Sequence, residues 1–270
     1  MSFDYENVKK VSFFQENRLE AHSDHISYAD REEATLGESS FRYSLNGLWK
    51  FQYARNYAQA PKDFQAPDVD CRSWEDIRVP AHIQMEGYDG PQYSNVAYPW
   101  DGREAIVPGQ IPEHFNPVAC YVKYFELPET MKEGPVIISF QGVESALALW
   151  CNGEYVGYSE DSFTPSEFDL TDLVKREGEN KLAAYVFKWS SGSWCEDQDF
   201  FRFSGIFRDV FLYTVPGIHI SDLRVQTILD DSYRNAELLL DFKATGAGKV
   251  SVKLLKENRL YSYSSEEPET

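Results

Sequence analysis

Asn95 and Asp199 have side-chain types that could bind a ligand, although residue type and spacing alone favour plainer roles for both. Asn95 lies in YSNVAYP, and Asp199 lies in EDQDFF. An amide offers two donors and an acceptor, and a carboxylate is a strong acceptor and a hard oxygen ligand, so both suit an array of hydroxyl groups. Each also has a plainer interpretation, Asn95 as a turn residue and Asp199 as an ion-pair partner of Arg202 or Arg208. The acidic cluster at this point of the sequence consists of Glu196, Asp197 and Asp199.

Other catalytic chemistries find little support in the sequence. His82 and the pair His22 and His25 could act as bases, but no GxSxG and no other Ser or Cys nucleophile motif accompanies them. We expect His22 and His25 to have packing or capping roles. The cysteines are far apart, with no CxxC or Cys/His cluster, and we predict buried thiols in a reduced compartment rather than zinc ligands or disulfides. They are Cys71, Cys120, Cys151 and Cys195.

The charge balance restricts the partners. The chain has 26 Lys and Arg against 44 Asp and Glu, a formal net charge of -18. Such a surface repels phosphate backbones and anionic lipids, so we predict neither a nucleic-acid nor a membrane partner, whereas a neutral sugar is compatible. The first ten residues, MSFDYENVKK, lack the apolar segment of a signal peptide, and no apolar run approaches a membrane span. We therefore expect a cytoplasmic protein.

The elements that must position these residues are predicted to be strands. Short runs rich in β-branched and aromatic residues are separated by Gly, Pro, Asn or Asp, which indicates an all-β sandwich with long loops. These runs span residues 48–54, 120–128, 135–143, 146–159, 180–189 and 206–215. Within 146–159, Asn152-Gly153 favours a type I′ turn, so ALALWC and EYVGYS should pair as a hairpin.

The segment 61–118 has many Pro, Gly, aromatic and polar residues and few candidate strands. A loop of this length inside a compact domain is commonly functional, and its aromatic and amide side chains suit a carbohydrate. The alternative is a cover that packs its own aromatic residues. Tyr98 and Trp100 fit either interpretation, whereas Trp150 and Trp189 lie within strand patterns and are predicted to be core residues.

Three parts of the chain are predicted. Residues 1–45 are polar and irregular and indicate an extended arm, and residues 46–216 form the main sandwich. Val215-Pro216-Gly217 marks a boundary, after which residues 217–270 contain further strand patterns. Because an immunoglobulin-like sandwich needs about 100 residues, we expect this last part to be an incomplete one.

Five multi-residue segments resemble the N-terminal region of β-galactosidases of glycoside hydrolase family 2, in matching order and spacing. They are RLEAHSDH (18–25), SLNGLWKF (44–51), VPAHIQMEGYDGPQYSNVAYPW (79–100), LWCNGEYVGYSEDSFTPSEFDLT (149–171) and WSSGSWCEDQDFFRFSGIFRDV (189–210). The resemblance implies a jelly-roll, galactose-binding-like β-sandwich followed by a partial immunoglobulin-like β-sandwich. In this family a (β/α)8 barrel follows and carries both catalytic glutamates. The family's Asn-Glu dipeptide is absent from this sequence.

The resemblance also implies roles for the two candidates. Asn95 matches an asparagine that bonds substrate hydroxyls in the barrel of the same subunit, and Asp199 matches an aspartate that contacts galactosyl hydroxyls and helps to hold a sodium ion. It implies retaining hydrolysis of terminal β-galactosides such as lactose by a homo-oligomeric enzyme, with subunit contacts from the arm and with magnesium ligands that lie outside this chain. Alone, the chain is expected to be inactive. The alternatives are a stand-alone carbohydrate-binding module and a non-catalytic subunit that complements a separate barrel-bearing chain.

Overall fold

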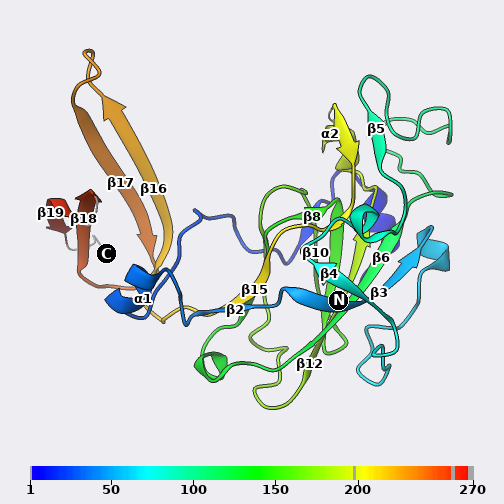
Figure 1. Cartoon of the computed structure of the whole chain (residues 1–270), viewed down its shortest axis with the longest axis horizontal. Helices are drawn as coiled ribbons and strands as arrows, with labels where there is room; N and C mark the ends of the chain where they lie inside the picture. The colour runs from blue at the N-terminus through cyan, green and yellow to red at the C-terminus, as the bar shows by residue number, and fades with distance from the viewer. Residues whose placement is uncertain (1, 197–198, 257–258, 267–270) are drawn as a thin grey trace. The chain divides into compact units, whose positions relative to one another are not determined.

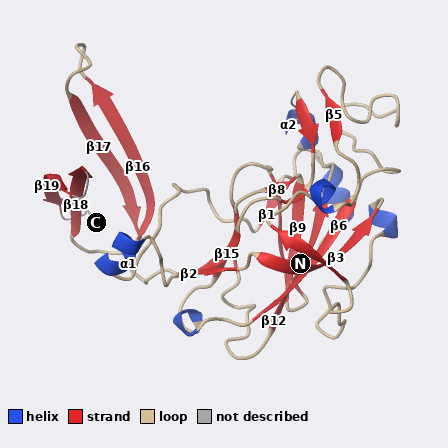
Figure 2. Cartoon of the chain, viewed as in Figure 1, coloured by secondary structure: helices blue, strands red, loops and turns tan. Residues whose placement is uncertain are grey.

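The computed structural model describes residues 2–196, 199–256 and 259–266, and Figures 1 and 2 show that strands and long loops dominate it. The predicted all-β class is confirmed. The chain divides into two compact units, residues 1–20 with 40–214 and residues 21–39 with 215–270, so the segment predicted as an arm contributes to both. The domain limits at residues 45 and 216 remain predictions.

Two sheets form the β-sandwich of the first unit. The larger has seven strands in the order β1-β10-β9-β12-β6-β3-β4, and the smaller has four in the order β11-β7-β15-β2. The strands of the larger are β1 (Gln15–Glu16), β3 (Gly47–Ala54), β4 (Glu75–Val79), β6 (Val118–Phe125), β9 (Ala146–Cys151), β10 (Glu154–Glu160) and β12 (Asn180–Phe187). Those of the smaller are β2 (Arg42–Ser44), β7 (Ile137–Phe140), β11 (Ser166–Asp169) and β15 (Val210–Tyr213).

The seven-stranded sheet is buried on both faces, which explains its continuous apolar runs. One face packs against the four-stranded sheet around residues such as Phe51, Phe140 and Phe168. The other is covered by the first residues of the chain and by the loop after β3, with Val8 and Phe64 fully buried. Every residue of β9 and β12 is consequently buried. This pattern departs from the usual alternation of antiparallel strands with one solvated face.

The predicted hairpin is confirmed. Residues 146–151 pair with 154–160, with Cys151 opposite Glu154, and Asn152 and Gly153 have φ values of 51° and 91°. Positive φ at both central positions is the requirement of a type I′ turn. Trp150 beside this turn is buried, as predicted, and so is Trp189.

Some elements differ from the sequence prediction. The run at 206–215 forms two strands, because residues 207–209 leave β14 to reach the smaller sheet. Helix α1 (Arg31–Leu36) buries no residue, so it has no apolar period, and its signals are the caps Asp30 and Gly37. The other short elements are α2 (Ser193–Glu196), η1 (Tyr5–Lys9), η2 (Tyr57–Gln59), η3 (Ile83–Glu86), η4 (Glu129–Met131), β5 (Gln92–Ser94), β8 (Val143–Glu144), β13 (Phe200–Arg202) and β14 (Gly205–Ile206).

The second unit consists of two antiparallel hairpins, in agreement with the expected immunoglobulin-like part. They are formed by β16 (Ile220–Leu229) with β17 (Ala236–Ala244) and by β18 (Val250–Lys256) with β19 (Arg259–Glu266). Ser23 and His25 attach residues 21–39 to β16. Ser23 accepts from the Leu223 amide at 2.9 Å, and Nε2 of His25 lies 3.0 Å from the Ile220 carbonyl oxygen. The packing role expected for His25 is thus confirmed.

The prediction for the cysteines holds for three of the four. All are free thiols, and Cys71, Cys120 and Cys151 are buried, but Cys195 is exposed. Cys195 lies on α2 two residues after the buried Ser193, and two helical steps turn a side chain by about 200°. Among the described residues, no helix has the length and apolar character needed to cross a membrane.

The close approach at Gly157 gives a test of the packing. A Cβ at this position would lie less than 3.0 Å from the Glu16 carbonyl oxygen and 2.8 Å from Cε1 of the buried Phe168. We expect Gly157→Ala to lower the free energy of unfolding of the purified chain by about 1–3 kcal/mol, as overpacking does. Gly90→Ala is the control, since a Cβ there meets nothing within 4 Å. Equal urea-denaturation midpoints for the two variants would contradict this packing.

Candidate functional site

Asn95 and Asp199 come together at one end of a two-stranded ladder. Strand β5 pairs with β13 in antiparallel register, with Tyr93 opposite Phe201 and Ser94 opposite Phe200. Asn95 directly follows β5 and Asp199 directly precedes β13, so the same register places them opposite each other. Residues 104 positions apart in the sequence therefore share one end of the ladder, although nothing in their local sequences alone would pair them.

Alternation along the two strands gives the ladder an outer and an inner face. Side chains two residues apart lie on the same face, so Tyr93, Asn95, Asp199 and Phe201 share one face. Asn95 and Asp199 are exposed, and Tyr93 and Phe201 are 57% and 50% exposed. The opposite face carries Arg202, which is only 3% exposed. The outer face thus presents an amide and a carboxylate beside two aromatic rings.

Arg202 joins the two strands from the inner face. Its guanidinium donates to the carbonyl oxygen of Phe200 at 3.2 Å and to that of Ser94 at 3.5 Å. The guanidinium also lies 4.9 Å from the centre of the Phe200 ring. A buried cation that bonds both strands fixes their separation. It thereby supports the outer face.

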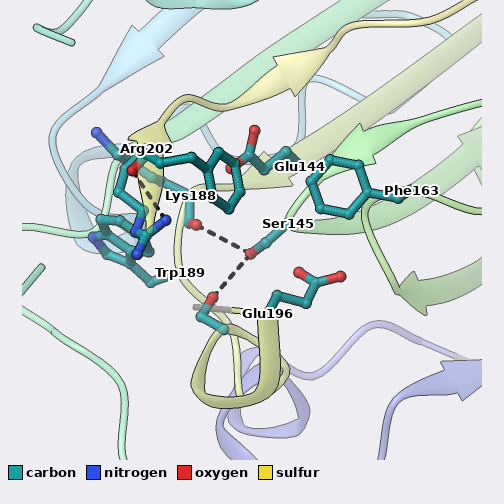
Figure 3. Close-up of a pocket in the computed structure, with 9 residues that line it drawn as sticks. Glu144, Ser145, Phe163, Lys188, Trp189, Glu196 and Arg202 are labelled. Carbon is teal, nitrogen blue, oxygen red and sulfur yellow. Dashed lines mark hydrogen bonds between the residues drawn. The ribbon is translucent and has the colours of Figure 1, made fainter. Parts of the chain in front are cut away.

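A small cavity lies behind the ladder, with a volume of about 20 Å³, which is room for about one water molecule. Figure 3 shows the side chains around Ser145, whose hydroxyl donates to the Lys188 carbonyl oxygen at 3.0 Å. The lining residues are Glu144, Ser145, Phe163, Lys188, Trp189, Ser193, Glu196, Phe200 and Arg202. The cavity therefore borders both α2, which precedes Asp199, and β13, which follows it.

Glu144 is a buried carboxyl group in this cavity without a cation of its own. Lys188 is paired with Asp89 at 2.5 Å, and the Glu196 carboxylate accepts from the amide and the hydroxyl of Ser162 at 2.6 and 2.7 Å. The Glu144 carboxyl makes no hydrogen bond within the described residues. Burial, and then the charge of Glu196, raise its pKa to about 8, against the opposing effect of Lys188 and Arg202.

His82 does not supply the missing charge. Its Nδ1 lies 4.0 Å from Oε2 of Glu144, and its ring is stacked between Phe203 and Phe207 with centroids 4.6 and 4.9 Å away. Burial lowers the pKa of His82. It is therefore neutral at pH 7, and so is Glu144. Within the described residues Nδ1 of His82 has no hydrogen-bond partner, so no hydroxyl or thiol is held there for a catalytic base to activate.

The plainer interpretations of the two candidates fare differently. The Asn95 side chain accepts from the next amide, that of Val96, at 2.6 Å within a bend of the chain, and it is also exposed. Asp199 accepts from the Tyr93 hydroxyl at 2.5 Å. Among the described residues neither Arg202 nor Arg208 is its hydrogen-bond partner. Of the acidic cluster, Asp197 lies outside the described residues.

The structure shows in the segment 61–118 the packing that its cover interpretation expected, and the carbohydrate interpretation stays a prediction. The segment packs its own aromatic residues, with Tyr98 stacked on Trp100 at 5.2 Å and Trp100 against Trp189 at 5.5 Å. Trp100 is buried, so strand-edge packing is its role here. The same loop also contains β4 and β5, and β5 carries Tyr93 into the ladder. The sequence analysis missed Tyr93, although its spacing of two from Asn95 is the signal of a shared strand face.

The proton on Glu144 predicts how stability depends on pH. Its pKa in the folded chain is about 8, against an ordinary value of 4.5, so between these values the folded state holds a proton that the unfolded state has released. The stabilisation is complete below about pH 4.5 and is lost as the pH rises through 8. We expect Glu144→Gln, which keeps the shape of the neutral acid, to reduce the decline in unfolding free energy from pH 5 to 8.

Urea denaturation at each pH unit measures this decline. The exposed Glu154→Gln serves as the matched control and should keep the slope of the unsubstituted chain. Identical slopes for the unsubstituted chain and Glu144→Gln would show that Glu144 is ionised throughout.

Comparison with known proteins identifies the family of this chain. The profile described as "Glycosyl hydrolases family 2, sugar binding domain" matches residues 42–216. β-Galactosidase from Halalkalibacterium halodurans is 53% identical over 248 residues, and that from Clostridium acetobutylicum is 48% identical over 254. These alignments cover 91% and 93% of this chain but 24% and 28% of the relatives. The chain thus spans about a quarter of their length.

Two further comparisons add detail. The β-galactosidase large subunit of Leuconostoc lactis is 44% identical, over 91% of this chain and 41% of that protein. Among solved structures, β-glucuronidases from an uncultured Clostridium sp. and from Bifidobacterium dentium have TM-scores of 0.59 and 0.61 at 21% and 19% identity. The alignments with these two structures cover 91% and 86% of this chain and 40% and 41% of the β-glucuronidase chains. They establish a shared fold. The chain therefore belongs to glycosyl hydrolase family 2 and contains the sugar binding domain of that family.

Proposed function

We propose that this chain is the N-terminal sugar-recognition region of a retaining β-galactosidase that hydrolyses terminal β-D-galactosides such as lactose. The observation that carries the proposal is the exposed ladder face on which Asn95 and Asp199 lie opposite each other. The amide can donate and accept, and the carboxylate accepts strongly, so together they suit neighbouring hydroxyl groups of one sugar ring. The two aromatic rings beside them, Tyr93 and Phe201, suit its C–H faces.

The chemical step is proposed to belong to polypeptide outside residues 1–270. Retaining hydrolysis uses a nucleophilic carboxylate and an acid/base carboxyl group about 5 Å apart on either side of the glycosidic bond. A catalytic barrel would supply both, either in the same parent chain or in a subunit that this chain complements. The role of Asn95 and Asp199 is then to orient the galactosyl group before the bond breaks.

A sodium ion at Asp199 is compatible with the residues present. The carboxylate is a hard oxygen ligand, and within the described residues only its Oδ1 is engaged, by Tyr93. In the same described part of the chain, no group of three or more His, Cys, Asp or Glu is arranged around a metal ion. Asp199 would therefore be one ligand, with the others from the barrel and the sugar. When bound, the ion would supply positive charge near sugar oxygens.

The remaining features of the parent enzyme are proposals from the same family. They are a cytoplasmic location, a homo-oligomeric assembly with contacts from the N-terminal residues, and magnesium held by ligands outside this chain. A complementing subunit is the main alternative, and the Leuconostoc lactis relative supports it because it is a large subunit. A stand-alone carbohydrate-binding module is the other, and it requires the isolated chain to bind galactosides.

The isolated chain tests this division of labour. We expect no hydrolysis of a chromogenic β-galactoside by the purified chain, because binding groups do not replace a nucleophile and an acid. Joining the chain to a barrel-bearing partner of this family, in one polypeptide or as two mixed chains, should produce turnover. Hydrolysis by the chain alone that Asp199→Ala abolishes would contradict the proposal, and tight galactoside binding by the chain alone would favour a binding module.

The active assembly tests the role of Asp199. We expect Asp199→Asn to lower kcat/KM for a β-galactoside by about 10- to 100-fold, because a hydrogen bond to a charged group is lost while the shape is kept. Asp68→Asn is the control, since Asp68 is an exposed carboxylate of the same unit away from the ladder. Steady-state kinetics with equal effects of both substitutions would argue against a galactosyl site at the ladder.

A further inference from the structure

The Tyr93 hydroxyl holds one oxygen of the Asp199 carboxylate. It donates to Oδ1 of Asp199 at 2.5 Å, across the ladder. Tyr93 lies opposite Phe201, and Asp199 is two residues before Phe201 on the same face, so the two are diagonal neighbours. A diagonal separation of about 7–8 Å between strands is within the reach of a tyrosine side chain. The contact therefore follows from the register of the strands.

The position of Tyr93 is fixed by contacts that need no ligand. Its ring packs against Phe201 with centroids 5.7 Å apart. One residue earlier, the Gln92 amide donates to the Pro99 carbonyl oxygen at 2.8 Å, which anchors the start of β5. One residue later, the Ser94 carbonyl oxygen accepts from Arg202. The chain is thus anchored on both sides of Tyr93, which fixes the position from which its hydroxyl reaches Asp199.

The carboxylate of Asp199 has no comparable support of its own. It is exposed, and within the described part of the chain its only hydrogen bond comes from Tyr93. An exposed aspartate samples several χ1 and χ2 states, and fixing it in one of them carries an entropic cost. Tyr93 is already fixed in the ladder and holds the carboxylate in one orientation before a ligand binds. The entropic cost of ordering Asp199 is therefore not added to the free energy of binding.

We propose that Tyr93 is a positioning residue, which orients the Asp199 carboxylate so that the second oxygen is presented to a sugar hydroxyl. This inference rests on the proposed function. The hydrogen bond to Asp199 has the largest effect in raising the pKa of Tyr93, and desolvation and the charge of Asp199 raise it further. The phenol therefore keeps its proton at neutral pH and donates. Tyr93 thus adds no charge to the site.

The first arm of the test uses the purified chain, without any assay of activity. Tyrosine labelled with ¹³C at Cζ is observed by NMR at neutral pH, and Tyr93→Phe identifies the Tyr93 signal by its loss. We expect the chemical shift of Tyr93 Cζ to change in Asp199→Ala, where the hydrogen-bond acceptor of the hydroxyl is gone. A Tyr93 signal at the same chemical shift in both chains would overturn the inference, whatever the assembled enzyme does.

The second arm is a double-mutant cycle in the active assembly. We expect Tyr93→Phe to lower kcat/KM for a β-galactoside by about 3- to 10-fold, the scale of one hydrogen bond, and by less than about twofold in the Asp199→Ala background. A residue that merely supports the fold would act equally in both backgrounds. Tyr43→Phe is the matched control, because Tyr43 is 37% exposed and its hydroxyl has no partner among the described residues.

The outcomes separate the two proposals. If Asp199→Ala leaves kcat/KM unchanged, the proposed galactosyl site is wrong. If Asp199→Ala lowers it but Tyr93→Phe has no effect, or the same effect in both backgrounds, the positioning role is wrong. Thermal unfolding of the Tyr93→Phe chain should match that of Tyr43→Phe, since both rings are retained. A selective drop in the unfolding midpoint for Tyr93→Phe would assign Tyr93 to the fold and overturn the inference.

Discussion

The candidate site depends on the pairing of β5 with β13. Arg202, on the buried face of this ladder, stabilises the pairing. Strand pleating sends alternate side chains to opposite sides, so one register decides at once which residues are offered to a ligand and which are buried. A shift by one residue would turn Asp199 inward and expose Arg202. The guanidinium bonds carbonyl groups of both strands, which favours the observed register. The buried Arg202 thus stabilises the register that keeps Asp199 on the exposed face.

The seven-stranded sheet supplies the rigidity behind this ladder. Because both of its faces are covered, strands such as β9 and β12 are apolar along their whole length and are held from two sides. The short strand β8 continues from this core to β14, where Glu144 pairs with Gly205. Only residues 203–204 separate β13 of the ladder from β14, so a short connection joins the ladder to this core. The placement of the candidate site therefore depends on a core to which neither Asn95 nor Asp199 belongs.

The sequence was sufficient for β3, β6, β9, β10 and β12 of the larger sheet and for the turn at Asn152, because each has a strong local signal, but not for β1 and β4. A family motif singled out Asn95 and Asp199, whose roles stay predictions. The sequence was insufficient where the signal is non-local. The pairing of Gln92–Ser94 with Phe200–Arg202 joins two segments more than 100 residues apart, and nothing in either segment specifies the other. The raised pKa of Glu144 likewise depends on its burial and on the charge of Glu196, and Lys188 beside it is paired with Asp89; only the folded arrangement establishes these contacts. Tyr93 has a local signal in its spacing of two from Asn95, but its contact with Asp199 is non-local as well.

The uneven exposure of the four thiols has a practical consequence. Cys195 is accessible on α2, four residues before Asp199, whereas Cys71, Cys120 and Cys151 are enclosed by the sandwich. A maleimide dye added to the native chain should therefore attach at a single place, without any engineered cysteine. That fluorophore would lie beside the ladder, and its emission could follow the arrival of a sugar or of a barrel-bearing partner in real time.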